Sequence, residues 1–196
     1  MRLLLIDNFD SFTYTLVDYL KQAGADCVVY RNNASLEKIT ADAYDAVVLS
    51  PGPGVPACAG NLMAVIDHYH TRCPMLGVCL GQQAIGQYFG AQLMKSARPM
   101  HGKVSTIDVD TTDVLFRGLT TQLQVTRYHS LTLTDVPPEL TITARCRTDG
   151  TNEIMAIRHQ HWPIFGVQFH PEAVLTQSGL LMLRNFLKTT KHDSTL

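Results

Sequence analysis

The sequence has no excess charge of either sign, because its 16 Lys and Arg residues nearly balance its 17 Asp and Glu residues. Binding to nucleic acid or to an anionic membrane surface usually requires a surplus of positive charge, so neither kind of partner is expected. Long apolar runs are also missing: the N-terminus has only four consecutive apolar residues, Leu3 to Ile6, before Asp7. Such a run is too short for a signal peptide or a membrane span, which predicts a cytoplasmic protein.

The five cysteines include no C-x2-C pair, so the spacing of a common metal site is absent. In a reducing cytosol they are expected as free thiols, and the default role of each is that of a small buried hydrophobic residue. Linkers, internal repeats and low-complexity segments are missing as well. The chain is therefore predicted to form a single domain over residues 1–196, with a frayed tail at 190–196.

Apolar runs alternate with helical patterns in the first half of the chain. They predict strands over residues 2–6, 26–30, 46–50 and 75–79, with helices over about 12–24, 35–40, 61–70 and 80–90. Asp10 or Ser11 is expected to cap the first of these helices. Strands and helices that alternate in this way are typical of a doubly wound parallel sheet with right-handed crossovers.

Closely spaced strand patterns dominate the second half. They lie at residues 103–110, 123–133, 140–146, 153–159 and 164–170, and a final helix is predicted over 179–190. Many of these patterns alternate between apolar and polar residues, as antiparallel strands do. Part of the sheet is therefore expected to be mixed or antiparallel, or a smaller second sheet is present.

A cysteine stands between two glycines where a strand is expected to pass into a helix. In the stretch G-V-C-L-G, Gly77 and Gly81 lie two residues before and two residues after Cys79. This spacing is typical of a nucleophile elbow, whose sharp strand-to-helix turn closes only when small residues flank the nucleophile. The helix N-terminus would lower the pKa of the thiol, and the N–H of Leu80 would face a developing oxyanion.

His170 and Glu172 end a predicted strand in the stretch F-H-P-E. Side chains two residues apart on an extended chain point to the same side, so Glu172 can reach one ring nitrogen of His170 while the other faces the thiol. Pro171 stops further ladder pairing and turns the chain. A thiolate that attacks an acyl carbon needs such a proton carrier and a carboxylate to orient it. A surface His and Glu that simply follow a strand would show the same sequence pattern.

The stretch PGPGVP at residues 51–56 follows another predicted strand. Its glycines can bring N–H groups close to a ligand, whereas Pro53 has none, so an oxyanion donor must come from Gly52, Gly54 or a later residue. Ligands of open α/β sheets bind beyond the carboxyl ends of the strands. Because this loop and Cys79 both follow strands, they belong to the same edge.

Together, these three stretches resemble the class I, or triad, glutamine amidotransferases. PMLGVCLGQQAI is similar to the family's nucleophile region, PGPG to its oxyanion loop, and HPE to the His and Glu of its triad. The stretches LLIDNFDSFTY, HGK and RYHSL resemble one branch, the glutaminase components of anthranilate synthase and aminodeoxychorismate synthase. The resemblance spans nearly the whole chain. It implies a flavodoxin-like α/β fold, in which helices cover both faces of a mixed, mostly parallel central sheet beside a smaller antiparallel sheet.

The resemblance also implies a role for each site residue. Cys79 would attack the side-chain amide of glutamine, His170 would give a proton to the leaving ammonia, and Glu172 would orient His170. The residues expected to contact the substrate, on the oxyanion side or along glutamine, are Gly52, Pro53, Gly54, Leu80, Gln83, Ser130 and Leu131. The stretch His101 to Lys103 would lie near the partner or the ammonia exit.

Two departures from this branch bear on the site. Many members have His where Gln82 stands, and Ser-Ile where Ala173 and Val174 follow the HPE stretch. A serine hydroxyl missing beside Glu172 would weaken the hydrogen bonding of that carboxylate.

The leading hypothesis is a glutaminase subunit without a cofactor that delivers ammonia to a separate synthase subunit. That partner would act on chorismate and would itself need Mg²⁺, since the elements above leave no room for a synthase domain. One alternative is a stand-alone cysteine hydrolase of γ-glutamyl substrates, and another is a redox-sensing α/β protein in which Cys79 is merely oxidised. A sensor needs no general base beside its thiol, which favours an enzyme, but the sequence does not separate anthranilate from aminodeoxychorismate synthesis.

Overall fold

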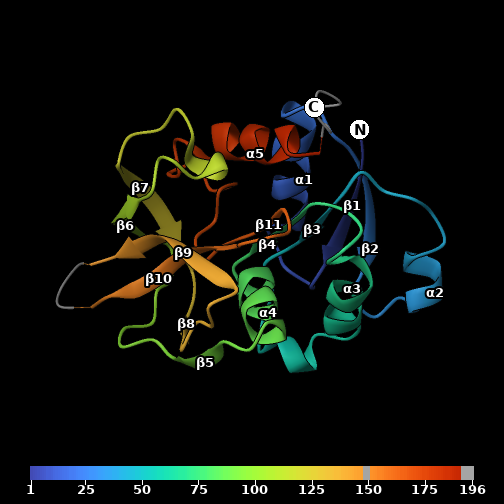
Figure 1. Cartoon of the computed structure of the whole chain (residues 1–196), viewed down its shortest axis with the longest axis horizontal. Helices are drawn as coiled ribbons and strands as arrows, with labels where there is room; N and C mark the ends of the chain where they lie inside the picture. The colour runs from blue at the N-terminus through green and yellow to red at the C-terminus, as the bar shows by residue number, and fades with distance from the viewer. Residues whose placement is uncertain (148–150, 191–196) are drawn as a thin grey trace.

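A nine-stranded mixed sheet forms the centre of the computed structural model, which describes residues 1–147 and 151–190. Its strands lie in the order β2-β1-β3-β4-β11-β10-β9-β6-β7 (Figure 1). The predicted frayed tail lies, from residue 191 on, outside the described residues. No helix within the described ranges is long and apolar enough to cross a membrane.

The first five strands in this order are parallel to one another. Their bounds are β2 Asp26–Arg31, β1 Arg2–Asp7, β3 Ala46–Leu49, β4 Met75–Val78 and β11 Ile164–Val167. Along β1, Leu3 and Leu5 pack into one core, while Leu4 and Ile6 pack into the other. Because a parallel strand covered on both faces has no polar face, its sequence reads as a continuous apolar run.

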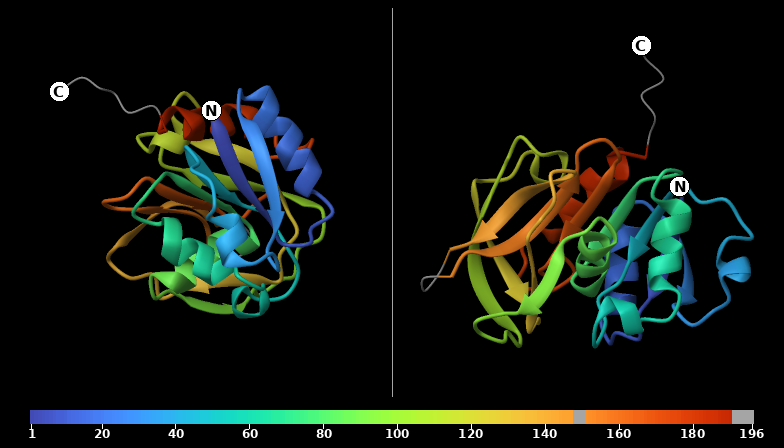
Figure 2. Two further views of the ribbon diagram at one scale, coloured as in Figure 1. Left: turned by 90° about the vertical axis from the view of Figure 1, so that its right-hand side faces the viewer. Right: turned by 60° about the horizontal axis from the view of Figure 1, so that its bottom comes forward.

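The remaining four strands pair antiparallel. They are β10 Glu153–His159, β9 Leu140–Cys146, β6 Lys103–Val109 and β7 Gln122–Arg127. Their pairings make β10 and β6 run against all the other strands of the sheet. Figure 2 shows this part beside the parallel part. The predicted mixed, mostly parallel sheet is confirmed.

A small antiparallel sheet, formed by β5 Gln92–Lys95 and β8 Leu131–Thr134, accompanies the large one as predicted. The prediction of one strand over 123–133 is wrong, because β7 and β8 belong to different sheets. The segment between them leaves the ladder, and the Ser130 carbonyl there accepts the N–H of Ser96 at 2.9 Å. β5 was not predicted, since three of its four residues are exposed and no alternation marks it.

Helices cover both faces of the large sheet (Figures 1 and 2). On one face lie α1 Thr13–Gln22 and α5 Gly179–Lys188, and on the other lie α2 Leu36–Ile39, α3 Leu62–Tyr69 and α4 Leu80–Tyr88. Short 3-10 turns occur at Pro56–Cys58 and Val114–Phe116. Each fully buried Leu or Val side chain in these cores stabilises the fold by about 1.5–3 kcal/mol.

The predicted cap of α1 is wrong. The residue before the helix is Phe12, and no side chain caps it. The Asp10 carboxylate instead accepts the N–H of Phe12, the residue just before the helix, at 2.7 Å. Asp10 therefore shapes the loop that precedes α1, and this loop borders the site described next.

Candidate active site

Cys79 lies at the sharp turn between β4 and α4. Its backbone has φ 53° and ψ −102°, a combination that a residue with a Cβ adopts only under strain. Two hydrogen bonds hold the turn: the N–H of Cys79 donates to the Val167 carbonyl at 2.8 Å, and its carbonyl accepts from the Gln83 N–H at 3.1 Å. The thiol thus stands at a helix N-terminus, where the partial positive charge favours an anion.

The two glycines beside Cys79 are required by backbone contact. A Cβ added to Gly77 would lie 2.4 Å from the carbonyl of Gly81, and one added to Gly81 would lie 2.4 Å from the carbonyl oxygen of Leu49. Because these neighbours are backbone atoms, they cannot move aside as a flexible side chain could. The absence of side chains lets α4 start directly against β3 and β4, which fixes the position of the thiol.

His170 and Glu172 form a buried pair beyond the end of β11. His170 Nδ1 lies 2.6 Å from Glu172 Oε1, and neither side chain is more than 3% exposed. Burial by itself would lower the pKa of His170, but interactions with the thiol of Cys79 and with Glu172 outweigh it and raise that pKa to about 10. Within the described residues Nε2 of His170 meets the criteria for a hydrogen bond with no other atom. Nδ1 is occupied by Glu172, so Nε2 is the ring nitrogen left for the thiol or a substrate.

A pocket of about 380 Å³ opens beside Cys79 and His170. The rings of Phe12 and Tyr128 lie against His170, with centroids 5.8 and 4.9 Å from its own. The other lining residues are Phe9, Asp10, Ser11, Pro51, Gly52, Pro53 and His101. The pocket thus joins the loop before α1, the loop after β3 and the elbow. His101 stands at its rim, while its expected role near an ammonia exit stays a prediction.

The loop after β3 is fastened at its start by Asn8. The N–H of Asn8 donates to Ser50 Oγ at 2.9 Å, and its Nδ2 donates to the Ser50 carbonyl at 2.8 Å. A Cβ on Gly52 would lie 2.5 Å from the Cβ of Asn8, so this approach needs glycine. In the described part of the chain, the N–H groups of Gly52 and Gly54 donate to no other residue. Gly52 lines the pocket, whereas Gly54 does not.

The expected substrate-contact residues do not all share one surface. Gly52 and Pro53 line the pocket with Cys79. Gln83 is buried under it, and its Nε2 donates to the Leu131 carbonyl at 3.1 Å. The others lie around this centre: Leu80 is buried at the start of α4, while Gly54 and Ser130 are exposed. The structure therefore joins Gln83 with Leu131, while the role of these residues in binding a substrate stays a prediction.

Gln168 is a residue that the sequence reasoning missed. Its Nε2 lies 3.6 Å from Cys79 Sγ, its Oε1 accepts from Gln83, and its side chain is fully buried. Gln168 stands two residues before His170, at a bend that follows the end of β11. The sequence pattern predicted one strand over residues 164–170, and the same-side rule was applied only from His170 to Glu172.

Both departures from the branch coincide with unpaired polar atoms. Among the described residues, neither the nitrogen nor the oxygen of the buried Gln82 amide has a hydrogen-bond partner. Glu172 Oε2 lacks a partner there too. This is the state that a missing serine hydroxyl at position 173 would leave.

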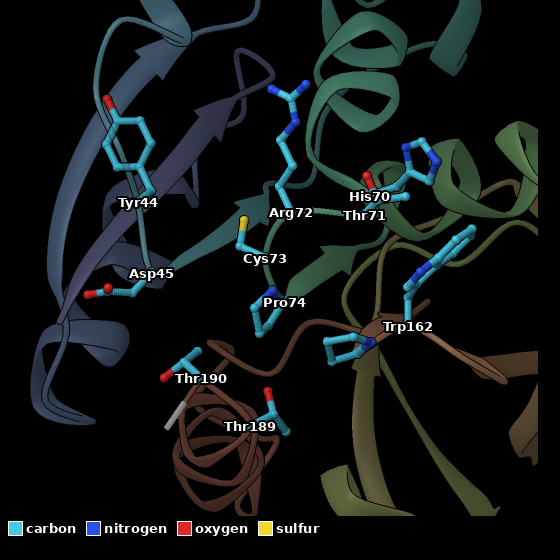
Figure 3. A pocket seen from close by; sticks show the side chains of 11 residues that line it. Tyr44, Asp45, His70, Thr71, Arg72, Cys73, Pro74, Trp162, Thr189 and Thr190 are labelled. Carbon is cyan, nitrogen blue, oxygen red and sulfur yellow. The ribbon is translucent and has the colours of Figure 1, made fainter. Parts of the chain in front are cut away.

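A second cavity, of about 370 Å³, lies where the parallel strand β4 begins, at the other end of that strand from Cys79 (Figure 3). Cys73 and Pro74 line it just before β4 begins, whereas Cys79 follows the end of that strand. Burial, and then Asp45, raises the pKa of the Cys73 thiol to about 11. Cys73 is therefore a neutral thiol near pH 7, unlike a nucleophile, and this cavity takes no part in the site.

Residues 4–190 match the family described as glutamine amidotransferase class-I. The chain is 47% identical to anthranilate synthase component 2 of Thermus thermophilus, covering 96% of this chain and 92% of the relative. It is 48% identical to aminodeoxychorismate synthase component 2 of Escherichia coli, covering 94% and 98%. It is 44% identical to aminodeoxychorismate/anthranilate synthase component 2 of Bacillus subtilis, covering 97% and 98%.

A solved structure agrees with these relatives in fold. It is a protein of Thermoplasma acidophilum, provisionally named as part of a GMP synthase, which is 27% identical to this chain. The two superpose with a TM-score of 0.86 over 97% of this chain and 94% of the other. The chain belongs to the class-I glutamine amidotransferases.

Proposed function

We propose that this chain is the cytoplasmic glutaminase subunit of a synthase that aminates chorismate, acting through Cys79, His170 and Glu172. The observation that carries the proposal is the strained Cys79 turn beside the buried His170–Glu172 pair. The relatives named anthranilate synthase and aminodeoxychorismate synthase component 2 support this branch over a stand-alone γ-glutamyl hydrolase. Because these relatives carry both names, the proposal covers both products.

In the first half of the reaction, the Cys79 sulfur attacks the side-chain amide carbon of glutamine. His170 takes up the thiol proton as the general base. The N–H of Leu80 and the free N–H groups of Gly52 and Gly54 stabilise the oxyanion that develops. The C–N bond then breaks as His170 gives its proton to the leaving nitrogen, which departs as ammonia and leaves a γ-glutamyl thioester on Cys79.

In the second half, the neutral His170 ring takes a proton from water, and the hydroxide attacks the thioester. The C–S bond breaks, so one glutamine and one water give one glutamate and one ammonia. Glu172 holds Nδ1 of the ring throughout and stabilises the imidazolium form. Gln83 contacts the glutamine, and the backbone of Ser130 and Leu131 holds its α-amino and α-carboxylate groups.

The ammonia is used by a separate synthase subunit that binds chorismate. Free ammonia would be protonated and diluted in water, so the product is useful only if it passes directly to that partner. The Mg²⁺ expected in the reaction belongs to the partner, and no cofactor is assigned to this chain. In the described ranges no three His, Cys, Asp or Glu side chains are grouped to hold a metal ion.

The test compares glutamine with ammonium as the nitrogen source. Cys79→Ser is combined with the synthase subunit, and Cys58→Ser, at an exposed cysteine, serves as the matched control. Cys79→Ser should abolish glutamine-dependent synthesis and leave ammonium-dependent synthesis intact, whereas the control should retain both. Glutamine-dependent synthesis by Cys79→Ser would refute the nucleophile. Glutaminase activity that is indifferent to every chorismate-using partner would favour the stand-alone hydrolase.

A further inference from the structure

Arg127 is the largest fully buried side chain of the described residues, and a cluster of polar groups meets its charge. Its Nη2 forms an ion pair with Glu153, whose other carboxylate oxygen accepts from Ser96 Oγ. Its Nη1 donates to Ser105 Oγ at 3.3 Å and to Cys146 Sγ at 3.4 Å. A buried pair is costly to break, because the remaining charge would be left uncompensated. The cluster therefore forms a rigid anchor between β7 and β10.

The remaining nitrogen of Arg127 fixes the tautomer of His129. Arg127 Nε lies 3.0 Å from His129 Nε2. A guanidinium has donors only, so His129 Nε2 must accept and must carry no proton. The ring proton is then on Nδ1, which donates to the Leu131 carbonyl at 2.9 Å. His129 is a neutral ring with one acceptor facing the anchor and one donor facing the segment 129–131.

The same carbonyl begins a path to the nucleophile. Leu131 O accepts a second hydrogen bond from Gln83 Nε2, and the other N–H of that amide donates to Gln168 Oε1, both at 3.1 Å. Gln168 Nε2 is thereby turned toward Cys79 Sγ at 3.6 Å. One chain of donors and acceptors, buried except at the Leu131 carbonyl, runs from the Arg127 anchor to the sulfur. Each amide in it has only one orientation that satisfies its neighbours.

We propose that this chain of hydrogen bonds positions the reacting groups, with Gln168 as the positioning residue for the Cys79 sulfur and His129 as that for the segment 129–131. The inference rests on the proposed function, because that segment is where glutamine is proposed to bind. An N–H aimed at sulfur favours the thiolate over the thiol and limits rotation of the side chain. A fixed Leu131 carbonyl keeps the neighbouring backbone groups in place for the substrate.

The first test replaces Gln168 by Met, which has a similar length but no N–H to donate. Alkylation of Cys79 by iodoacetamide is followed against pH by mass spectrometry of its peptide, with the exposed Cys58 as the internal reference. The profile of Cys79 should move to higher pH by about one to two pH units, since a hydrogen bond to a charged group is lost. In complex with the synthase subunit, kcat for glutamine should fall roughly 10- to 100-fold, with KM within about threefold.

The control is Gln87→Met, a half-buried position on the same helix as Gln83. It should change neither the alkylation profile nor kcat. If Gln168→Met folds and alkylates like the control, the assignment of Gln168 is overturned. If it does not fold, the side-chain amide N–H signals of Gln168 are followed by NMR in the unaltered chain. They should shift as the Cys79 thiol titrates, and an unmoved signal overturns the assignment equally.

The second test concerns His129. Asn can place an N–H where Nδ1 stands, whereas Ala cannot, so His129→Asn should keep the bond to Leu131 that His129→Ala loses. In complex with the synthase subunit, KM for glutamine should rise roughly 5- to 10-fold in His129→Ala, with a smaller fall in kcat. In His129→Asn, KM should stay close to that of the unaltered chain. Equal KM values in both variants would overturn the role of His129. A chain that never hydrolyses glutamine refutes the proposed function instead, while alkylation and NMR still decide whether Gln168 holds the sulfur.

Discussion

His170 Nδ1 lies 2.6 Å from Glu172 Oε1 at a place where solvent reaches neither side chain appreciably. The carboxylate has one partner in the described residues, because its Oε2 is unpaired. Its whole effect therefore passes through the ring: it orients His170 and stabilises the protonated form. The two residues differ in task, since only His170 exchanges protons with the reacting atoms.

This difference predicts unequal losses on mutation. His170→Ala should lower the turnover of glutamine by roughly 10²- to 10⁴-fold, the range typical for a general acid–base group. Glu172→Ala should cost less, because the ring remains and can still carry a proton. Turnover is measured with the synthase subunit present, and circular dichroism establishes that both variants fold. A well-folded Glu172→Ala that is slower than a well-folded His170→Ala would contradict the assignment of roles.

Buried His129 predicts a loss of stability in acid. Burial, and then the charge of Arg127, lowers the pKa of His129 to about 4. A group whose folded pKa is depressed below 6.5 stays neutral in the fold while the unfolded chain takes up a proton. The contribution of His129 to the free energy of unfolding is therefore complete above pH 6.5. As the pH falls toward 4, the free energy of unfolding should decrease by on the order of 3 kcal/mol.

The measurement is urea unfolding between pH 7.5 and about 4, comparing the unaltered chain with His129→Asn, since Asn does not titrate there. His170, whose raised pKa changes stability above about pH 6.5, is present in both proteins, so its effect cancels in their difference. The difference in unfolding free energy between the two proteins should shrink as the pH falls. A constant difference across the window would show that His129 is not held neutral.

We expect the substitution Gln82→Met to stabilise the fold. The Gln82 amide is fully buried against Gly166, where an added Cβ would lie 2.8 Å from Gln82 Cγ, and within the described residues it has no hydrogen-bond partner. Met has nearly the same shape and no unsatisfied N–H, so Gln82→Met should raise the free energy of unfolding by about 1–3 kcal/mol. Urea unfolding measures this, and Gln87→Met should have little effect. A clear destabilisation by Gln82→Met would mean that the amide has a partner, such as a buried water.

Much of the fold could be predicted from the sequence, because apolar periodicity reports directly which faces are buried. The run Leu3 to Ile6 predicted a strand covered on both sides, and alternation in the second half predicted the antiparallel part. The break between β7 and β8 could not be predicted. It depends on Ser96 reaching the Ser130 carbonyl across the fold, a contact that leaves no local pattern.

The residues of the candidate site also differ in how well the sequence marks them. Cys79 and His170 could be identified from the sequence because of their neighbours, namely the flanking glycines and Glu172 two residues on. Gln168 and Arg127 could not be identified, since their partners come from other elements. In the sequence, Gln168 is only a polar residue within an apolar run. The structure shows its importance, because its side chain contacts both Cys79 and Gln83.

The loop after β3 has the properties of a switch. Asn8 holds its start through Ser50, but the part from Pro53 to Val55 is exposed. Gly54 has φ 77° and a Cβ there would meet nothing within 4 Å, so this peptide can turn without displacing a neighbour. Because free N–H groups of this loop are proposed to bind the oxyanion, its conformation would set the activity of the site.

The last prediction is that the isolated chain is a poor glutaminase. Hydrolysis without an acceptor wastes glutamine, and binding of the synthase subunit with chorismate should shift the loop toward the conformation that binds the oxyanion. The gain cannot exceed the partner's preference for that state, typically about 1–3 kcal/mol, or roughly 5- to 150-fold where the competent state is rare. Ammonia release from glutamine is measured on the purified chain, then with the partner, then with partner and chorismate. Because Cys79→Ser should release none in any of the three, it supplies the baseline, and full activity of the lone chain would refute the coupling.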